Sequence, residues 1–326
     1  MLCLRRDKGP CSHRFLKISR SITFRNINSQ SCLASCKYSE INVIIKIHDT
    51  VEKIGRSLVQ HGRYNDRIYL MKLHGGETDK VFEYIGALLQ KHSYSKIFAK
   101  IPSEAQKFFR EKNFVKEAEI PRFYNGHSKG LFLCNYLSPG RKYQKEQTKT
   151  KINNVLTMAR KKALSLHNLT LPAGFSLERL DDSHGKKLAA LYKKVFPTYP
   201  FPIYDSEYLL QSMRETSVYF GVFFENKLVA ASSAEMDVEA ENVEMTDFAT
   251  DPDFNKNGLS LVLLDTMEHE MKKLNIKTFY TIARSLSYGM NITFSKRGYT
   301  YSGTLINNTN ISGKIESMNV WYKHSC

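Results

Sequence analysis

The sequence predicts a mixed α/β protein, and three observations lead to this fold class. Segments with the strand period and segments with the helix period alternate through most of the 326 residues. Apolar residues make up 42% and charged residues 25%, a composition typical of globular proteins. Residues 242–274 have the pattern of a strand, a polar turn with one glycine, and a long amphipathic helix. The first N–H groups of such a helix have no intrahelical partners, so this turn suits a phosphate-bearing ligand.

The net charge of +16 suggests an anionic partner, either nucleic acid, a membrane surface or a polyphosphate cofactor. Residues 1–40 contribute +6 and residues 141–162 contribute +7. Clusters confined to a tail and a linker are more typical of solvated segments than of a binding face. The basic runs lack interleaved aromatic residues, and no window approaches the ~18 apolar residues of a membrane helix. We therefore expect neither a nucleic-acid nor a membrane partner, and the sequence leaves the oligomeric state open.

The cysteines and the N-terminal segment bear on the compartment. Four of the six cysteines lie in residues 1–40, and no pair has CxxC spacing or a histidine pair nearby. This arrangement predicts free thiols in a reducing, cytoplasmic compartment and no metal site. Residues 1–40 are rich in Arg and Ser, as transit peptides are, but they lack the apolar stretch of a signal peptide. We interpret them as a basic, disordered extension.

Residues 41–140 have the pattern of a first, smaller α/β domain. Residues 49–62 fit either a short helix or a connecting segment. Ser103 is the expected N-cap of a helix, and Asn113 fits its left-handed stop. The periodic segments predict strands at 41–47, 67–73, 96–101, 114–120 and 130–136, and helices at 78–91 and 103–112.

A basic linker, residues 141–172, is expected to be partly helical at 155–166 and leads to a second domain, 173–326. Asp181 and Asp205 occupy N-cap positions of two helices. The pattern predicts strands at 175–180, 217–224, 228–236, 277–283, 299–306 and 315–323, a helix within 287–296, and a loop of asparagines after 306. The strands on either side of residues 225–227 form an antiparallel hairpin in this prediction.

The two halves contain a faint internal repeat. Residues 96–120 and 277–305 each run strand, helix with a phenylalanine near its end, and strand. Residues 74–77 (HGGE) stand where the second half has its phosphate-type turn, and they are shorter and carry an acid. We infer two related domains, of which the first lacks the ligand site. Chance similarity between generic strand–helix–strand patterns is the alternative.

From residue 175 on, the element order β–α–α–β–β–β–α–β–α–β–β resembles the GNAT superfamily of N-acetyltransferases. In that family the turn after the fourth strand is written Gln/Arg-x-x-Gly-x-Gly/Ala, and its amides bind the pyrophosphate of acetyl-CoA. Here the turn is NKNGLS, residues 255–260, which keeps the central Gly258 and departs at Asn255 and Ser260. The resemblance implies a C-terminal GNAT fold preceded by a smaller, degenerate GNAT-like N-terminal domain.

Segments of both halves also resemble the β-lysine N-acetyltransferases. They are NDRIYLMKL, YSKIFAKIP, EMTDFATDP, FYTIARSLSYGMN, GTLINNTNISG and ESMNVWYK, so the likeness covers about residues 41–323. This resemblance implies transfer of acetyl from acetyl-CoA to the N6 amine of β-lysine, in partnership with lysine 2,3-aminomutase, to give a compatible solute for osmoadaptation. An acetyltransferase for another amine (a polyamine, lysine or a protein N-terminus) is one alternative. A non-catalytic, GNAT-like basic binding module is the other.

The GNAT resemblance implies roles for individual residues around acetyl-CoA. Its expected contacts are Phe248, Ala249, Thr250, Asn255, Lys256, Asn257, Gly258, Leu259, Ser260 and Asn291. Aligning Gly298-Tyr299 with the family's Gly-Phe/Tyr pair puts Phe294 at the position of the usual general acid, a tyrosine. Phenylalanine cannot donate a proton, so either Tyr288 substitutes or the thiolate leaves unassisted.

Acetyl transfer to an amine also needs a group that removes a proton from the ammonium. Glu244 is the expected base, because many GNAT enzymes carry a glutamate at that level of the fourth strand. Asp247 is the second catalytic candidate, and it could instead bind the substrate ammonium. Strand alternation places the two acids on opposite faces unless the strand bulges. A solvent-facing acid is the alternative for Glu244.

A zwitterionic amino acid needs a cation for its carboxylate as well. Arg284 ends the strand at 277–283 and suits a bidentate clamp, unless it pairs with an acid of the protein. Tyr199 and Tyr204, in the proline-rich loop, are expected to wall the substrate pocket. Asn307 and Asn308 are expected to reach over it.

Overall fold

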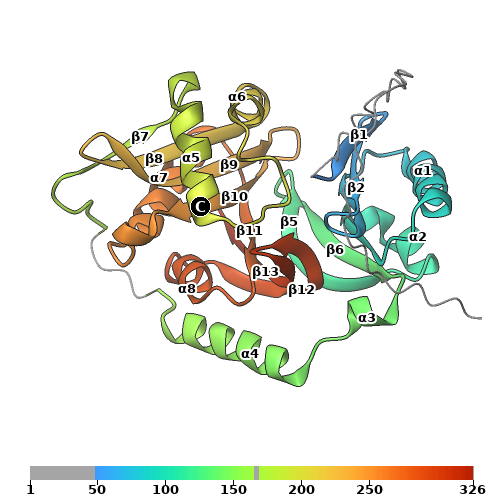
Figure 1. Ribbon diagram of the computed structural model, residues 1–326. Helices are drawn as coiled ribbons and strands as arrows, with labels where there is room; N and C mark the ends of the chain where they lie inside the picture. The colour runs from blue at the N-terminus through green and yellow to red at the C-terminus, as the bar shows by residue number, and fades with distance from the viewer. Residues whose placement is uncertain (1–47, 165–168, 326) are drawn as a thin grey trace, which may run out of the picture. The chain divides into compact units, whose positions relative to one another are not determined.

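The computed structural model describes residues 48–164 and 169–325, which form two mixed β-sheets (Figure 1). The first sheet has the strand order β1-β2-β3-β4-β6-β5 and is antiparallel except for the pair β3–β4. The predicted strand at 41–47 and the extension 1–40 lie outside the described residues. The elements are β1 (Thr50–Ile54), β2 (Ser57–Gly62), β3 (Arg67–Lys72), α1 (Thr78–Lys91), β4 (Lys96–Pro102), a 3₁₀ turn (Ser103–Ala105), α2 (Gln106–Glu111), β5 (Val115–Tyr124) and β6 (Ser128–Tyr136).

Residues 49–62 form the hairpin of β1 and β2, and not the helix or connecting segment that the sequence suggested. Ile54 pairs with Ser57, so Gly55 and Arg56 make a two-residue turn, with Gly55 at φ +63°. A glycine at the first turn position is typical of a type II′ hairpin. The two strands are too short for their periodicity to separate them from a helix.

The second sheet has seven strands in the order β12-β13-β11-β10-β9-β8-β7, and only β10 and β11 are parallel. The order of elements along the chain is the predicted one. The elements are β7 (Phe175–Arg179), a 3₁₀ turn (Asp182–His184), α5 (Gly185–Val195), α6 (Ser206–Glu215), β8 (Ser217–Phe224), β9 (Lys227–Asp237), β10 (Asn242–Thr250), a 3₁₀ turn (Pro252–Phe254), α7 (Leu259–Lys273), β11 (Thr278–Arg284), α8 (Tyr288–Lys296), β12 (Thr300–Ile311) and β13 (Lys314–His324).

The two sheets have the same connectivity. Strands β8-β9-β10-β11-β13-β12 of the second sheet repeat the order β1-β2-β3-β4-β6-β5 of the first. In each sheet the one parallel pair is joined by a long helix, α1 in the first and α7 in the second, and a second helix follows the fourth strand of the repeat. This agreement confirms the internal repeat and the smaller, GNAT-like first half inferred from the sequence.

The described residues belong to one compact unit, and the two sheets share a hydrophobic core. Phe98 and Phe132 reach this core from the first sheet, and Leu305 and Val320 reach it from the second. Burial of such side chains on both sides ties the folding of one half to the other.

The asparagines after residue 306 continue β12 and bind the first half of the chain, although the sequence suggested a loop. The Asn310 side chain donates a hydrogen bond to the carbonyl of Tyr64 at 2.8 Å. The buried Arg141 donates to the carbonyl of Asn307 at 2.7 Å. The polar run looks like a loop in the sequence because its partners, in the turn before β3 and at the start of the basic linker, are far away along the chain.

The basic linker contains α3 (Pro139–Lys142) and the longer α4 (Glu146–Lys161), which begins earlier than the helix predicted at 155–166. One face of α4 is buried, with Val155 and Ala159 on it, whereas Met158 is exposed. The hydroxyl of Ser295, on α8, donates to the carbonyl of Ala159 at 2.8 Å, and Figure 1 shows α4 running beside α8.

The helix caps follow the sequence with one exception. Asp181 and Asp205 accept hydrogen bonds from backbone N–H groups at their helix starts, as predicted. Ser103 is not a cap, because it lies inside the 3₁₀ turn that precedes α2. None of the helices in the described residues is long and apolar enough to cross a membrane.

Candidate active site

Strand β10 separates from β11 toward its C-terminal end and bulges against β9. It pairs with β11 only from Asn242 to Glu244, and its register against β9 shifts between Thr246 and Ala249. Asp247 lies inside this bulge at φ +55°, a conformation that few non-glycine residues adopt. Because β10 and β11 separate here, the sheet has an opening at its middle.

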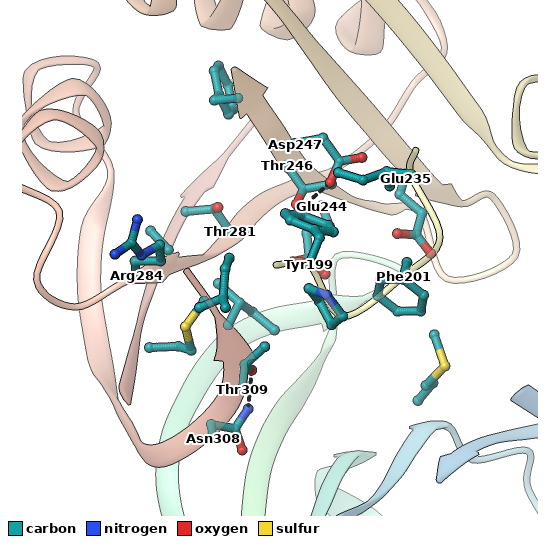
Figure 2. Close-up of a pocket in the computed structure, with 18 of the residues that line it drawn as sticks. Tyr199, Phe201, Glu235, Glu244, Thr246, Asp247, Thr281, Arg284, Asn308 and Thr309 are labelled. Carbon is teal, nitrogen blue, oxygen red and sulfur yellow. Dashed lines mark hydrogen bonds between the residues drawn. The ribbon is translucent and has the colours of Figure 1, made fainter. Parts of the chain in front are cut away.

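A pocket of about 200 Å³ lies at this opening (Figure 2). Strands β10, β11 and β12 and the proline-rich loop at 196–204 contribute part of its wall. The first sheet contributes another part, through Arg67 and Tyr69 on β3 and Phe98 and Lys100 on β4. The first half of the chain is therefore part of the site, which the sequence did not indicate.

Glu244 and Asp247 both line this pocket, although strand alternation alone would place them on opposite faces. Three steps along β10, from Thr246 to Ala249, match two steps along β9. The extra residue of this bulge turns Asp247 to the side on which Glu244 lies. The sequence analysis allowed for a bulge as the exception to strand alternation, and the structure contains that bulge.

The surroundings of Glu244 shift its acidity. Burial raises the pKa of Glu244 to about 7, repulsion from Glu235 adds to the rise, and Lys100 and the Tyr280 hydroxyl act against it. The Nζ atom of Lys100 donates a hydrogen bond to the hydroxyl of Tyr280 at 2.8 Å. Glu235 also lines the pocket, and desolvation of its carboxylate by the surrounding protein raises its pKa as well. A carboxylate with a pKa near neutrality can gain and lose a proton at working pH.

Asp247 is held from two sides. The hydroxyl of Tyr199 donates to its Oδ1, and the hydroxyl of Ser233 donates to its Oδ2 at 2.6 Å. Burial raises the pKa of Asp247, while these two hydrogen bonds lower it. The contact with Tyr199 also ties the proline-rich loop to β10. Tyr199 lies in the pocket wall (Figure 2).

Arg284 lines the pocket, but its guanidinium already has a carboxylate partner. Its Nε and Nη2 donate to Oε2 and Oε1 of Glu316 at 3.0 and 3.1 Å. Glu316 lies on β13 and is 4% exposed. The edge of Arg284 that was expected to clamp a substrate carboxylate is thus used inside the protein.

The turn before α7 has an open, left-handed glycine. Gly258 is the N-cap of this 15-residue helix, with φ +73°, and apart from its chain neighbours no residue has a heavy atom within 4 Å of the position that a Cβ would take. Lys256 is also left-handed, at φ +72°. Asn255 does not cap the helix, and the side chain of Asn257 donates to the carbonyl of Phe254 at 3.0 Å.

Asp251 anchors the segment between β10 and this turn. It is buried and pairs with Lys194 at 2.6 Å and Lys227 at 2.9 Å. Desolvation works against its charge, but the two lysines outweigh it and lower the pKa of Asp251 to about 2. The carboxylate is therefore ionised throughout the physiological range and holds the turn at the end of β10.

Four expected site residues outside β10 and the turn at 255–260 do not line the pocket. The Tyr204 hydroxyl donates to the carbonyl of Phe196, and the Asn307 side chain donates to the carbonyls of Arg141 and Tyr143. Tyr288 is 48% exposed. Of the residues expected around the substrate, Tyr199, Arg284 and Asn308 do line the pocket.

Asn291 is the fourth, and the protein uses both ends of its buried amide. Its nitrogen donates to the carbonyls of Arg284 and Ser287, and its oxygen accepts from Asn319 and the Trp321 indole. These bonds tie α8 to β11 and β13, so Asn291 has a structural role and no free group for a CoA chain.

Sequence reasoning missed Arg67, Lys100 and Glu235 in the pocket wall and Tyr280 beside Glu244. All four lie in ordinary strand patterns, and only the folded structure shows that they lie together around the pocket. The lysine and arginine of the first sheet were hidden by the inference that this half lacks a ligand site. Within the described residues, no group of three His, Cys, Asp or Glu side chains is placed to hold a metal ion.

Comparison with known proteins agrees with this architecture. Residues 186–290 match the family model described as the acetyltransferase (GNAT) family. A β-lysine N(6)-acetyltransferase from Methanococcus maripaludis is 39% identical over 277 residues, which cover 85% of this chain and 99% of the relative. The N-acetyltransferase YodP from Bacillus subtilis is 30% identical over 82% of this chain and 95% of its own length. A β-lysine N(6)-acetyltransferase from Methanosarcina mazei is 29% identical over 76% of this chain and 97% of its own. Likeness of this extent shows that the chain belongs to the GNAT family and is an acetyl-CoA-dependent N-acetyltransferase.

Proposed function

We propose that this enzyme transfers the acetyl group of acetyl-CoA to the N6 amine of β-lysine and yields Nε-acetyl-β-lysine. The observation that carries the proposal is the extent of the likeness. The 277 residues aligned at 39% identity are too many to come from one half of the chain, and both halves line the pocket. The likeness to a named β-lysine enzyme therefore extends to the half that completes the acceptor side of the pocket.

In this proposal the product is a compatible solute that serves osmoadaptation, and lysine 2,3-aminomutase supplies the acceptor. We place the reaction in the cytoplasm. The buried, unpaired thiol of Cys134 is in keeping with a reducing compartment.

The turn at Gly258 fits the pyrophosphate of acetyl-CoA. The space beside Gly258 is open, and the free N–H groups and positive dipole end of α7 favour an anion there. In the proposal, the turn at 255–260 holds the phosphates, and the backbone of Phe248, Ala249 and Thr250 holds the pantetheine arm at the open edge of β10. Acetyl-CoA supplies an activated thioester, and the protein supplies the base and the walls of the pocket.

Glu244 is the proposed general base. An alkyl amine has a pKa near ~10 and arrives as an ammonium, so it must lose a proton before it can attack. A pKa of about 7 leaves about half of Glu244 ionised at neutral pH, and the ionised form can hold the proton that it accepts. Asp247, fixed by Tyr199 and Ser233, binds the ammonium in this proposal.

The departure of the thiolate needs no protein acid in this proposal. Tyr288 is exposed and lies outside the pocket wall, and Phe294, which does line the pocket, has no proton to give. Of the two alternatives that the sequence left open, unassisted departure fits this placement better.

An acetyl-CoA turnover assay with four acceptors tests the substrate. The acceptors are β-lysine, α-lysine, a diamine and a lysine-containing peptide, and we expect the highest kcat/KM for β-lysine. A clear preference for the diamine would replace the amino-acid acceptor with a polyamine. Absence of turnover with all four would contradict the proposed reaction.

The Glu244→Gln variant tests the base. We expect kcat to fall about 10²–10⁴-fold, the usual contribution of a positioned base, while the KM for acetyl-CoA stays the same. Glu225→Gln, in the exposed turn between β8 and β9, is the matched control. A kcat of Glu244→Gln within twofold of the wild type would remove Glu244 from the mechanism.

A further inference from the structure

We propose that Arg67 and Asn308 form a subsite that binds the head group of an amino-acid acceptor, its carboxylate and the ammonium beside it. The inference rests on the proposed function, which it deepens, because it says which groups distinguish an amino acid from a simple diamine. Arg67 belongs to β3 of the first sheet, and Asn308 belongs to β12 of the second. Both line the pocket.

Arg67 is a buried cation without an acidic partner. Arg67 is 3% exposed, and no carboxylate of the described residues lies within ion-pair distance of its guanidinium. Its guanidinium lies 5.1 Å from the ring centre of Tyr69 and 5.8 Å from that of Phe98. Burial lowers the pKa of Arg67 to about 10. Buried charges are normally paired, so an unpaired one in a pocket wall calls for an anion from outside.

One edge of the Arg67 guanidinium lacks a close hydrogen-bond partner. Nη1 donates to the carbonyl of Asn308 at 2.6 Å and to the hydroxyl of Thr309 at 3.0 Å. Nη2 has only a 3.4 Å bond to Gln60, and the buried Nε has no partner. Nε and Nη2 form the edge through which Arg284 binds Glu316. The edge that binds a carboxylate in Arg284 has no carboxylate partner in Arg67, and in this proposal it takes both oxygens of the acceptor carboxylate.

Asn308 offers the complementary group. Its Oδ1 is buried and accepts no hydrogen bond. An unpaired acceptor next to an unpaired donor suits a head group that carries an ammonium close to its carboxylate. In β-lysine the carboxylate is at C1 and the first amine at C3, so the two groups can reach neighbouring partners.

The position of the subsite fits the direction of the acceptor. Figure 2 shows Asn308 and Thr309 at the end of the pocket away from Asp247. An acceptor whose head group lies at Asn308 therefore directs its C6 amine toward Glu244 and Asp247. This arrangement gives the first half a function without a cofactor site of its own, because it carries the cation that recognises the acceptor.

Three acceptors separate the two parts of the subsite. β-Lysine has both head groups, 6-aminohexanoate has only the carboxylate, and pentane-1,4-diamine has only the amine. We expect Arg67→Met to lower kcat/KM on the order of 100-fold for β-lysine and 6-aminohexanoate. For the diamine, kcat/KM should change by less than about threefold. Asn308→Leu should lower kcat/KM about tenfold for β-lysine and the diamine, and less for 6-aminohexanoate.

Arg141→Met is the matched control for the loss of a buried arginine. Arg141 is 6% exposed and donates to the carbonyls of Asn307 and Asn308, but it does not line the pocket. The Arg141→Met variant should leave the ratio of kcat/KM between β-lysine and the diamine unchanged. Thermal melting and acetyl-CoA binding of each variant show whether the fold is intact, and the ratio between acceptors is insensitive to a loss of folded enzyme.

The outcomes separate the subsite from the proposed function. If the wild type prefers β-lysine but Arg67→Met keeps the wild-type ratio, the subsite is wrong and the function stands. The same follows if Arg284→Met, and not Arg67→Met, changes the ratio. If the wild type acetylates a different amino acid, the proposed substrate is wrong, and that acceptor and its decarboxylated form then test Arg67. Equal use of the diamine and its amino acid by the wild type overturns the subsite.

Discussion

The Nζ atom of Lys100 lies 2.8 Å from the hydroxyl oxygen of Tyr280, and this contact joins the two sheets beside Glu244. Lys100 is on β4 and Tyr280 is on β11, which are equivalent strands of the internal repeat. The first half of the chain therefore sets part of the electrostatic environment of the proposed base. The positive charge of Lys100 lowers the pKa of Glu244, while burial and Glu235 raise it.

The Lys100→Met variant should move the acidic limb of the pH profile upward. Glu244 acts as a base only when it is ionised, so kcat/KM falls as pH drops through its pKa, which is about 7 in the wild type. Removing the positive charge raises that pKa. A pKa higher by one unit leaves about tenfold less ionised base on the acidic side. The measurement is kcat/KM between pH 5.5 and 9 at saturating acetyl-CoA.

Lys80→Met is the control for the loss of a lysine, because Lys80 is exposed on α1 and does not line the pocket. Its acidic limb should coincide with that of the wild type. At high pH the Lys100→Met and wild-type rates should converge, since Glu244 is then ionised in both. A profile of Lys100→Met shifted toward lower pH would contradict the assignment of Glu244 as the titrating base.

The sequence was sufficient for the order of elements from β7 to β13, because strand and helix periods and capping residues are local signals, and the resemblance of whole segments indicated the family. Asp205, for example, caps α6 as its sequence position indicates. Local signals also located the turn at Gly258, since a glycine between polar residues before an amphipathic helix is typical of a helix start with free N–H groups.

The contents of the pocket were not predictable in the same way. Arg67 and Asn308 are 241 residues apart, and nothing in either segment marks the other as its neighbour. The partner of Arg284, the expected clamp, was unpredictable for a related reason: Glu316 lies on a strand that the sequence could not place beside it. The bulge at Asp247 is likewise a property of the pairing with β9 and has no signature in β10 alone.

Gly258→Asp should raise the KM for acetyl-CoA by at least tenfold. The added carboxylate would lie where the proposal places the pyrophosphate, and any side chain at φ +73° costs about 1 kcal/mol in folding stability. The first effect concerns the ligand and the second concerns the fold, so a control has to separate them. The measurement is KM for acetyl-CoA at saturating acceptor, together with the thermal midpoint.

Gly76→Asp supplies that control from the other half of the repeat. Gly76 lies just before the N-cap of α1, with φ +80°, and apart from its chain neighbours no residue has a heavy atom within 4 Å of the position of its missing Cβ. The two substitutions should lower the thermal midpoint by similar amounts. Only Gly258→Asp should change the KM for acetyl-CoA, and an equal change in both variants would remove the turn at Gly258 from the cofactor site.

The buried pair Lys96–Glu117 should make the two sheets unfold together. The Nζ atom of Lys96 lies 2.8 Å from Oε2 of Glu117 and 2.8 Å from the carbonyl of Ile306 on β12, and Lys96 is fully buried. Lys96→Met leaves the Glu117 carboxylate buried without a counter-charge, so we expect a loss of about 3–5 kcal/mol in the free energy of unfolding. Lys96→Met combined with Glu117→Gln should recover part of this lost free energy, because the amide oxygen still accepts from the N–H of Ile306.

The control is Lys273→Met, which breaks the exposed pair with Glu270 and should cost less than about 1 kcal/mol. Urea unfolding of the full chain should give one transition for the wild type. If Lys96→Met is as stable as Lys273→Met, the contact between the two sheets does not depend on the Lys96–Glu117 pair.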